Sequence, residues 1–199
     1  MPMGETVSAL DEYAELVNYK NDLFILELGC GGGSGLYAIA KSLRKSNKII
    51  CVDKRWDCIK IADAIADTMS LSEHMCGFVA YFDSLPFSDE TFDVVCMHFS
   101  LDSSLAINKT IQEVSRVLKK DGLFVNLSNA ESYARDKRIF ELFDIPKFEW
   151  RNVYKKVKLY SGFDDLIDLS KENNLYLSQH KSINANGQQI ILAVFKKDN

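Results

Sequence analysis

Glycine is concentrated in one short stretch, because five of the seven residues from 29 to 35 are glycines. The largely apolar residues 24–28 precede this stretch and have the length of a strand buried on both faces of a parallel sheet. Residues 36–40 follow it and read as the opening of a helix. Glycine takes positive φ and lets the main chain approach a ligand closely. The sequence therefore predicts a ligand cradle between a strand and a helix.

Carboxylates follow the next two predicted strands. Asp53 comes directly after the apolar residues 48–52, and Asp83 comes directly after residues 78–82. A carboxylate at the tip of the second strand suits a ribose, because it accepts hydrogen bonds from two adjacent hydroxyl groups. Two families of proteins that bind nucleotide cofactors share this feature, so the spacing of the glycines is needed to tell the two families apart.

The glycine spacing fits one of these families better than the other. The dinucleotide fingerprint Gly-x-Gly-x-x-Gly, counted from Gly29, places Ser34 where a third glycine or alanine belongs. The pattern found is Glu27-x-Gly29-x-Gly31-x-Gly33, which resembles motif I of the class I S-adenosylmethionine-dependent methyltransferases. Residues 83–95, DSLPFSDETFDVV, are similar to the matching stretch of the small-molecule branch related to the ubiquinone and menaquinone methyltransferases, methyltransferase domain type 11. The resemblance covers about residues 24–128.

The resemblance implies a function and a set of site residues. It implies S-adenosyl-L-methionine as the cofactor, S-adenosyl-L-homocysteine as its product, and methyl transfer to a nucleophilic atom of a small-molecule acceptor. In the family the loop passes beneath the amino acid end of the cofactor, and the acid after the third strand accepts from the adenine amine. The expected cofactor-binding residues are Glu27, Gly29, Cys30, Gly31, Gly33, Asp53, Lys54, Asp83, Ser84 and His98. Lys54 or Arg55 could cover one side of the adenine, although the family more often has an apolar residue directly after the acid.

The residues after the fourth predicted strand, 92–97, are expected to separate cofactor from acceptor. Ligands bind beyond the carboxyl ends of such strands, at the point where the spatial order of the strands in the sheet reverses. His98 is a candidate general base, although its ring can equally cap main-chain groups or pack on the cofactor. Asp102 is a second catalytic candidate, and a helix cap or surface position is the alternative. Relatives carry a histidine pair where Asp102 and Ser103 stand, so no role transfers from that pair.

The same resemblance predicts the elements that position these residues. The fold class is α/β: a Rossmann-like, doubly wound, mostly parallel seven-stranded sheet of order 3-2-1-4-5-7-6, with a C-terminal antiparallel hairpin. The hairpin is placed at residues 175–182 and 188–195, because Asn186-Gly187 is a strong turn signal. A helix over 107–118 closed by a glycine turn at 119–122 and a fifth strand over 123–127 are expected before it.

A single methyltransferase domain over residues 1–199 suits the length and the 47% hydrophobic content. Its expected parts are an N-terminal helix or lid over 1–22, a cofactor-binding core over 23–128, a variable cover for the substrate over 129–163, and a helix with the terminal hairpin over 164–199. The helix over 1–22 is expected to begin at Ser8, with Tyr13 and Tyr19 as possible lid residues. The cover is rich in aromatic and basic residues, which could hold the acceptor or form a solvated surface.

Composition limits the classes of binding partner and the cellular compartment that are expected for the protein. The net charge of −4 and the pI near 5.4 argue against nonspecific nucleic-acid binding. No secretory signal and no run of about 18 apolar residues is found, so no membrane span is expected. The five cysteines form no C-x-x-C pair, which favours free thiols, a cytoplasmic location and no metal site.

Two other functions remain open at this level. A non-catalytic S-adenosylmethionine-binding subunit, regulatory or partner to an enzyme, would carry the same loop. An NAD(P)-dependent reductase would share the loop and the acid at Asp53. Residues 98–101 stand where an Asn-Pro-Pro-Tyr motif for amino-group methylation would lie, which disfavours nucleic-acid bases and protein glutamine as acceptors.

Overall fold

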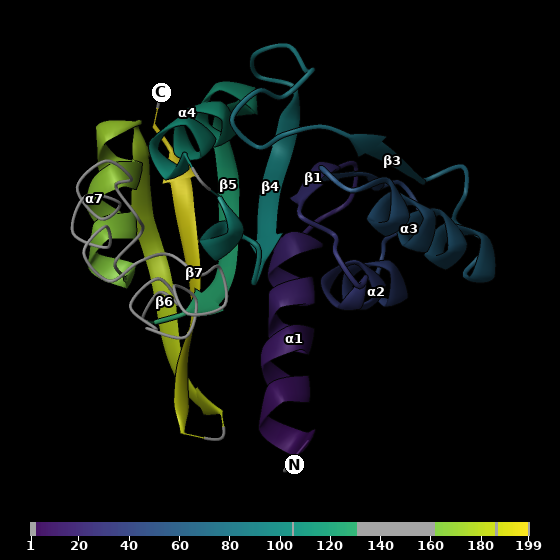
Figure 1. The fold of residues 1–199 in the computed structure, drawn as a ribbon, viewed down its shortest axis with the longest axis horizontal. Helices are drawn as coiled ribbons and strands as arrows, with labels where there is room; N and C mark the ends of the chain where they lie inside the picture. Colours follow the sequence, from purple (N-terminus) through teal and green to yellow (C-terminus); the bar gives the residue numbers. More distant parts are fainter. Residues whose placement is uncertain (1–2, 105, 131–161, 186, 199) are drawn as a thin grey trace, which may run out of the picture.

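A seven-stranded sheet forms the centre of the protein, and helices cover both of its faces (Figure 1). The computed structural model describes residues 3–104, 106–130, 162–185 and 187–198. The strands are β1 Phe24–Leu28, β2 Lys48–Asp53, β3 Met75–Val79, β4 Phe92–His98, β5 Leu118–Asn129, β6 Leu175–Ala185 and β7 Gln188–Lys197. The helices are α1 Met3–Val17, α2 Ser34–Lys41, α3 Trp56–Thr68, α4 Ile107–Val117 and α7 Phe163–Glu172, with a 3₁₀ turn, η1, at Leu101–Ser103.

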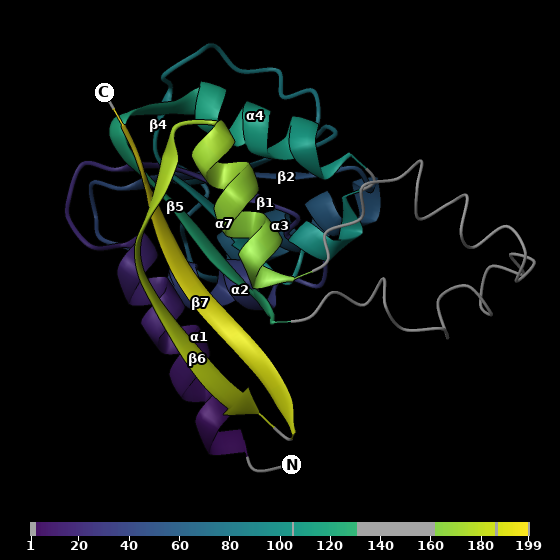
Figure 2. The ribbon, with the colours of Figure 1, turned by 90° about the vertical axis from the view of Figure 1, so that its left-hand side faces the viewer.

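The strand order is β3-β2-β1-β4-β5-β7-β6, which confirms the predicted fold class. Strands β1 to β5 pair in parallel, whereas β7 runs antiparallel between β5 and β6. The order reverses between β1 and β4, so the carboxyl ends of these two strands form the crevice where such sheets bind ligands. The predicted hairpin is confirmed and is longer than expected, and it extends beside α1 (Figure 2).

Two hydrophobic layers hold the sheet in place. Helices α1, α2 and α3 pack on one face, and α4 and α7 pack on the other. In β1, Ile25 and Leu26 have no exposed surface although they point to opposite faces. A parallel strand covered on both sides needs apolar residues in succession, which explains why β1 reads as an apolar run.

The third strand lies earlier in the chain than expected. It was expected at residues 78–82, whereas β3 spans Met75–Val79 and pairs with β2 alone. The pairing ends where Val79 lies opposite Asp53, the last residue of β2. Tyr81 instead forms an isolated bridge with Ser84. Because β3 is an edge strand, its apolar residues Phe78 and Val79 are exposed, so burial does not mark the end of the strand.

The expected glycine turn at the end of α4 is also wrong. The helix ends at Val117, and β5 begins at Leu118 instead of Leu123. Leu118 pairs with Phe92, and the register then shifts so that Leu123 pairs with Val94. The left-handed residue in this irregular stretch is Asp121, with φ 61°. Residues 119–122 therefore bend the start of a strand and do not close a helix.

The N-terminal helix begins at Met3, so Ser8 lies inside α1 and not at its start. Tyr13 has no exposed surface, whereas Tyr19 is 40% exposed. Tyr13 is thus a core residue in this structure. Most of the variable cover predicted for 129–163, including its basic and aromatic part, lies outside the described residues.

Candidate functional site

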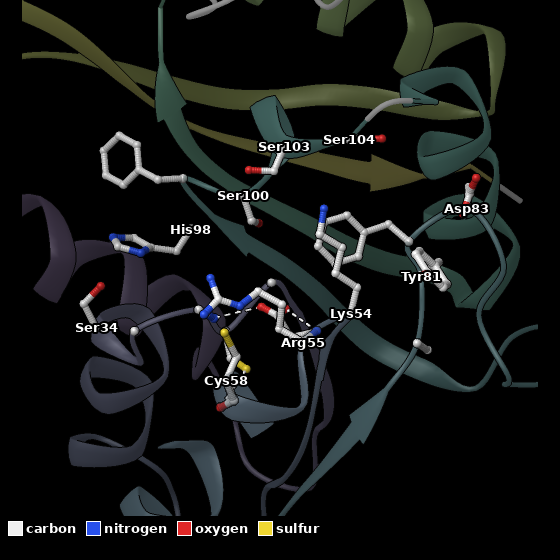
Figure 3. A pocket seen from close by; sticks show the side chains of 18 of the residues that line it. Ser34, Lys54, Arg55, Cys58, Tyr81, Asp83, His98, Ser100, Ser103 and Ser104 are labelled. Atoms are coloured by element: carbon white, nitrogen blue, oxygen red, sulfur yellow. Dashed lines mark hydrogen bonds between the residues drawn. The ribbon is translucent and has the colours of Figure 1, made fainter. Parts of the chain in front are cut away.

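A cavity of about 740 Å³ opens at the carboxyl ends of β1, β2 and β4. Its walls come from the loop after β1, the tip of β2, the segment after β3 and the connection from β4 to α4 (Figure 3). The described residues that line it are Gly29, Cys30, Gly31, Gly32, Ser34, Asp53, Lys54, Arg55, Cys58, Ala80, Tyr81, Phe82, Asp83, His98, Phe99, Ser100, Ser103, Ser104 and Ala106.

The loop after β1 takes a shape that only glycine accommodates easily. Gly29 has φ 85° and Gly33 has φ 83°, both in the left-handed region. A Cβ at Gly29 would collide with Ser100 Cβ, and a Cβ at Gly33 would collide with Ile65 of α3. The loop therefore lies tightly between the tip of β4 and α3, with its main chain along the cavity.

Asp53 joins the tip of β2 to this loop. One carboxylate oxygen, Oδ2, accepts a hydrogen bond from the Gly31 N–H at 3.0 Å, and Oδ1 accepts one from the Arg55 N–H at 3.0 Å (Figure 3). Asp53 is 8% exposed, so its carboxylate is held in one orientation. Each oxygen keeps a second lone pair, with which the carboxylate can accept from a pair of ligand hydroxyls.

Glu27 lies behind the cavity wall and does not line it. Its side chain is 1% exposed, and Oε2 has no hydrogen-bond partner among the residues that the structure describes. Burial, followed by the nearby charge of Asp53, raises the pKa of Glu27 to about 8. The carboxyl group is therefore mostly protonated at neutral pH, and its unpartnered oxygen is poised for a new polar neighbour.

His98 is the last residue of β4 and faces the cavity beside the loop. Its ring centroid is 5.7 Å from that of Tyr13 and 4.9 Å from that of Phe99. Burial lowers the pKa of His98 to about 4, so the ring is neutral at pH 7. Within the described part of the chain, neither ring nitrogen is hydrogen-bonded. A neutral imidazole here can donate a hydrogen bond to a ligand or accept one from it.

Asp102 lies on η1, near the cavity but not among its lining residues. Burial raises the pKa of Asp102 to about 6, and a hydrogen bond with the Asn129 side chain opposes this rise. Its Oδ1 atom is buried without a partner in the described ranges of the chain. The carboxyl group thus titrates closer to neutral pH than an ordinary aspartate.

The segment after β3 is fixed by Arg116 of α4. The Arg116 guanidinium donates to the carbonyl oxygens of Phe87 at 2.7 Å and Leu85 at 3.1 Å. Glu113 accepts from the Leu85 N–H at 2.7 Å and also binds Arg116. These contacts position the short segment that carries Asp83 at the cavity.

The structure brings most of the predicted site residues together. Those that line the cavity are Gly29, Cys30, Gly31, Asp53, Lys54, Asp83 and His98, whereas Glu27, Gly33, Ser84 and Asp102 do not line it. Ser34 and His98 lie at one end of the cavity, and Tyr81 and Asp83 lie at the other (Figure 3).

Sequence reasoning did not assign several lining residues. They are Gly32, Ser34, Cys58, Ala80, Tyr81, Phe82, Ser103, Ser104 and Ala106. Closeness to a predicted strand tip was a signal for most of them, because each strand delivers the residues after it to the same edge. Cys58 and Ala106 reach the cavity through the packing of α3 and α4, which local sequence does not reveal.

Two classes of feature are not found in the described residues. No group of three or more His, Cys, Asp or Glu side chains there is arranged to hold a metal ion. None of the described helices combines the length and the apolar character that crossing a bilayer requires.

Residues 20–157 match a family model described as a methyltransferase domain. The chain belongs to this family. The match confirms the resemblance drawn from the glycine loop and the residues after β3.

The known proteins that resemble this chain agree with the family. The chain is 26% identical over 155 residues to the demethylmenaquinone methyltransferase of Lactobacillus johnsonii, covering 78% of the chain and 59% of that protein. It is 31% identical over 141 residues to the ubiquinone/menaquinone biosynthesis C-methyltransferase UbiE of Rickettsia felis, covering 68% and 56%. The chain therefore spans less than three fifths of these relatives. The fold matches the crystal structure of the YcgJ protein of Bacillus subtilis with a TM-score of 0.73 at 16% identity, over 97% of the chain and 99% of YcgJ.

Proposed function

We propose that this protein transfers the methyl group of S-adenosyl-L-methionine to a nucleophilic atom of a small-molecule acceptor. The observation that carries the proposal is the contact between Asp53 and the Gly31 N–H. It makes the acid at the second strand tip and the glycine loop one continuous surface. A nucleoside with an amino acid tail fits such a surface, because the sugar and the tail bind to adjoining groups.

The residues of the chain fit this cofactor. We assign the main chain of the loop, which lines the cavity at Gly29, Gly31 and Gly32, to the methionine end. The free oxygen of Glu27 lies behind this wall. We assign Asp53 to the ribose hydroxyls and Asp83, with the adjoining Ser84, to the adenine. Lys54 covers one side of the base. The bound cofactor supplies a methyl group already activated on a sulfonium, and the protein holds the two reactants in line and excludes water.

The two catalytic candidates, His98 and Asp102, differ in their position relative to the cavity and in their pKa. His98 lines the cavity, but a pKa of about 4 makes it a weak proton acceptor. Asp102 has a pKa of about 6 and a free oxygen, but it lies outside the lining. We assign His98 to hydrogen bonding with the acceptor and Asp102 to accepting its proton where the acceptor must lose one.

Two further points complete the proposal. The names of the curated relatives, which concern quinone biosynthesis, support a small molecule as the acceptor. The net charge of −4 supports an acceptor other than nucleic acid. We expect the reaction to take place in the cytoplasm, because the described cysteines are free thiols.

Ligand-dependent thermal stability tests the proposal. S-adenosylhomocysteine and S-adenosylmethionine should raise the melting temperature, because a ligand that binds only the folded state stabilises it. Protection by NADH or NADPH, without protection by S-adenosylhomocysteine, would indicate the reductase. Metabolite fractions incubated with methyl-labelled cofactor then test transfer. Tight cofactor binding with no transfer across all fractions would indicate a non-catalytic binding subunit.

A further inference from the structure

Phe99 has a strained backbone directly after β4. Its φ of 49° lies in the left-handed region, where a bulky residue is unfavourable. The Phe99 N–H donates to the Leu127 carbonyl at 2.8 Å, which helps hold this conformation. The ring belongs to neither core cluster and is 36% exposed. Core packing does not require an aromatic ring here, and such strain often marks a functional position.

The left-handed turn places Phe99 in the wall of the cavity. In an extended strand, consecutive side chains point to opposite faces of the sheet. At the end of β4 this alternation stops, and His98, Phe99 and Ser100 line the cavity in succession. The rings of His98 and Phe99 meet at 82°, so together they form an aromatic corner.

Ser100, the residue directly after this corner, contacts the start of the glycine loop. The Ser100 hydroxyl donates to the Leu28 carbonyl at 2.5 Å, and a Cβ at Gly29 would collide with Ser100. Under the proposed function, on which this step rests, the loop carries the methionine end of the cofactor. The sulfonium at the end of that tail then lies on the side of β4.

No charged carboxylate lines this end of the cavity in the described part of the chain. The lining acids are Asp53 and Asp83. Asp53 is bound to the loop, and Asp83 lies at the end opposite His98 (Figure 3). Glu27 is outside the lining, and its raised pKa keeps it mostly uncharged. Asp102 also lies outside the lining, so the described wall at this end brings no full negative charge against a sulfonium, whereas the face of an aromatic ring in the wall supplies negative potential.

We propose that the Phe99 ring binds the sulfonium of S-adenosylmethionine through a cation–π interaction. The ring thereby distinguishes the positively charged cofactor from the neutral thioether that remains after transfer. The strained backbone is kept because it presents the ring at this point. Phe99 is on this view a residue that selects the charged cofactor and favours release of the product.

Calorimetric dissociation constants for the two ligands test the proposal without an activity assay. In Phe99→Leu, S-adenosylmethionine should bind about three- to tenfold more weakly, whereas S-adenosylhomocysteine should change less than twofold. Phe99→Gly should give the same selective loss, and it accepts φ 49° without strain, so its folding is not at risk. Fluorinated phenylalanines at position 99 should weaken the binding of S-adenosylmethionine relative to that of S-adenosylhomocysteine stepwise. Each fluorine weakens the negative potential of the ring face at nearly constant ring size.

Phe82→Leu is the matched control, because Phe82 lines the same cavity and its ring tip is near Gly29. Its ratio of the two dissociation constants should equal that of the unsubstituted protein. Equal weakening of both ligands in Phe99→Leu would overturn the inference and leave the proposed function standing. A charge-selective loss in Phe82→Leu alone would overturn it also. Failure of both ligands to bind the unsubstituted protein would overturn the proposed function and the inference together.

Discussion

Glu27 and His98 both approach the same point on the first turn of α2. A Cβ at Gly35 would lie 2.8 Å from Glu27 Oε1 and 2.8 Å from His98 Cβ. The absence of a side chain at Gly35 lets the helix approach the carboxyl ends of β1 and β4. The buried acid and the cavity-lining histidine thus both pack against Gly35, a glycine outside the left-handed loop positions.

Gly35→Ala should test how much this close approach matters. The added methyl group must displace Glu27, His98 or the helix, so we expect the free energy of unfolding to fall by about 1–3 kcal/mol. Urea unfolding at pH 7 measures the change. Gly32→Ala is the matched control, because nothing lies within 4 Å of the Cβ position at Gly32. Equal stability of the two variants would show that α2 moves away without cost.

Glu27→Gln should change the pH dependence of stability. Glu27 has a pKa of about 8 in the folded protein, against an ordinary value of 4.5. The folded state therefore holds an extra proton between these values, and the stability it provides is complete below pH 4.5 and lost as pH rises through 8. Glutamine cannot ionise. The stability of the variant relative to the unsubstituted protein should rise from pH 4.5 to 8, by on the order of 4–5 kcal/mol.

The quantity to measure is the difference between the stability–pH curves of Glu27→Gln and of the unsubstituted protein. The titration of His98 changes the stability of both in the direction opposite to that of Glu27. The pKa of His98 is lowered from 6.5 to about 4, so its effect makes the fold more stable as pH rises across that interval. His98 is present in both proteins and its contribution cancels. Parallel stability curves for the two proteins would contradict a raised pKa at Glu27.

Asp53→Ala should weaken the binding of S-adenosylhomocysteine by about 1–3 kcal/mol. The change removes the proposed ribose contact and also the acceptor of the Gly31 N–H. Asp53→Asn should lose less, because an amide oxygen can still accept from the loop. Calorimetry gives both affinities. Asp67→Ala, which removes an exposed carboxylate near the far end of α3, should bind normally, and an unchanged affinity in Asp53→Ala would remove the ribose assignment.

Asn47 should be a major determinant of stability away from the cavity. It has no exposed surface, its Oδ1 accepts from the Leu23 N–H at 3.0 Å, and its Nδ2 donates to the Lys20 carbonyl at 3.0 Å. Asn47→Ala leaves these buried groups unpaired, so we expect a loss of about 2–4 kcal/mol in urea unfolding. Asn47→Asp keeps the acceptor and should lose less. A loss below 1 kcal/mol would show that water replaces the side chain.

The elements that position the site were largely predictable from sequence. Strand β1 is buried on both faces, so its composition marks it, and the turn at Asn186-Gly187 marks the hairpin. Asp53 was found because parallel strands deliver their last residues to one edge. These features are local consequences of burial and turn chemistry.

The remaining features depend on tertiary contacts that local sequence does not report. Strand β3 was misplaced because it is an edge strand and lacks the apolar signal of a central one. Glu27 lies behind the lining, where Gly35 of α2 approaches it, and its expected contact with the cofactor stays a prediction. Phe99 lay in the segment expected between cofactor and acceptor, but it received no role of its own because a phenylalanine gives no sign that its backbone is left-handed.

The place of β7 between β5 and β6 has a consequence for synthesis of the chain. Phe195 near the end of β7 is fully buried, and β5 has no antiparallel neighbour until residues 188–197 have left the ribosome. Until then one whole side of β5 presents unpaired amides and carbonyls, which is a template for pairing with other chains. Nascent protein should therefore be prone to pairing with other chains until β7 has been synthesised, although its glycine loop and both neighbouring strands emerge before β7.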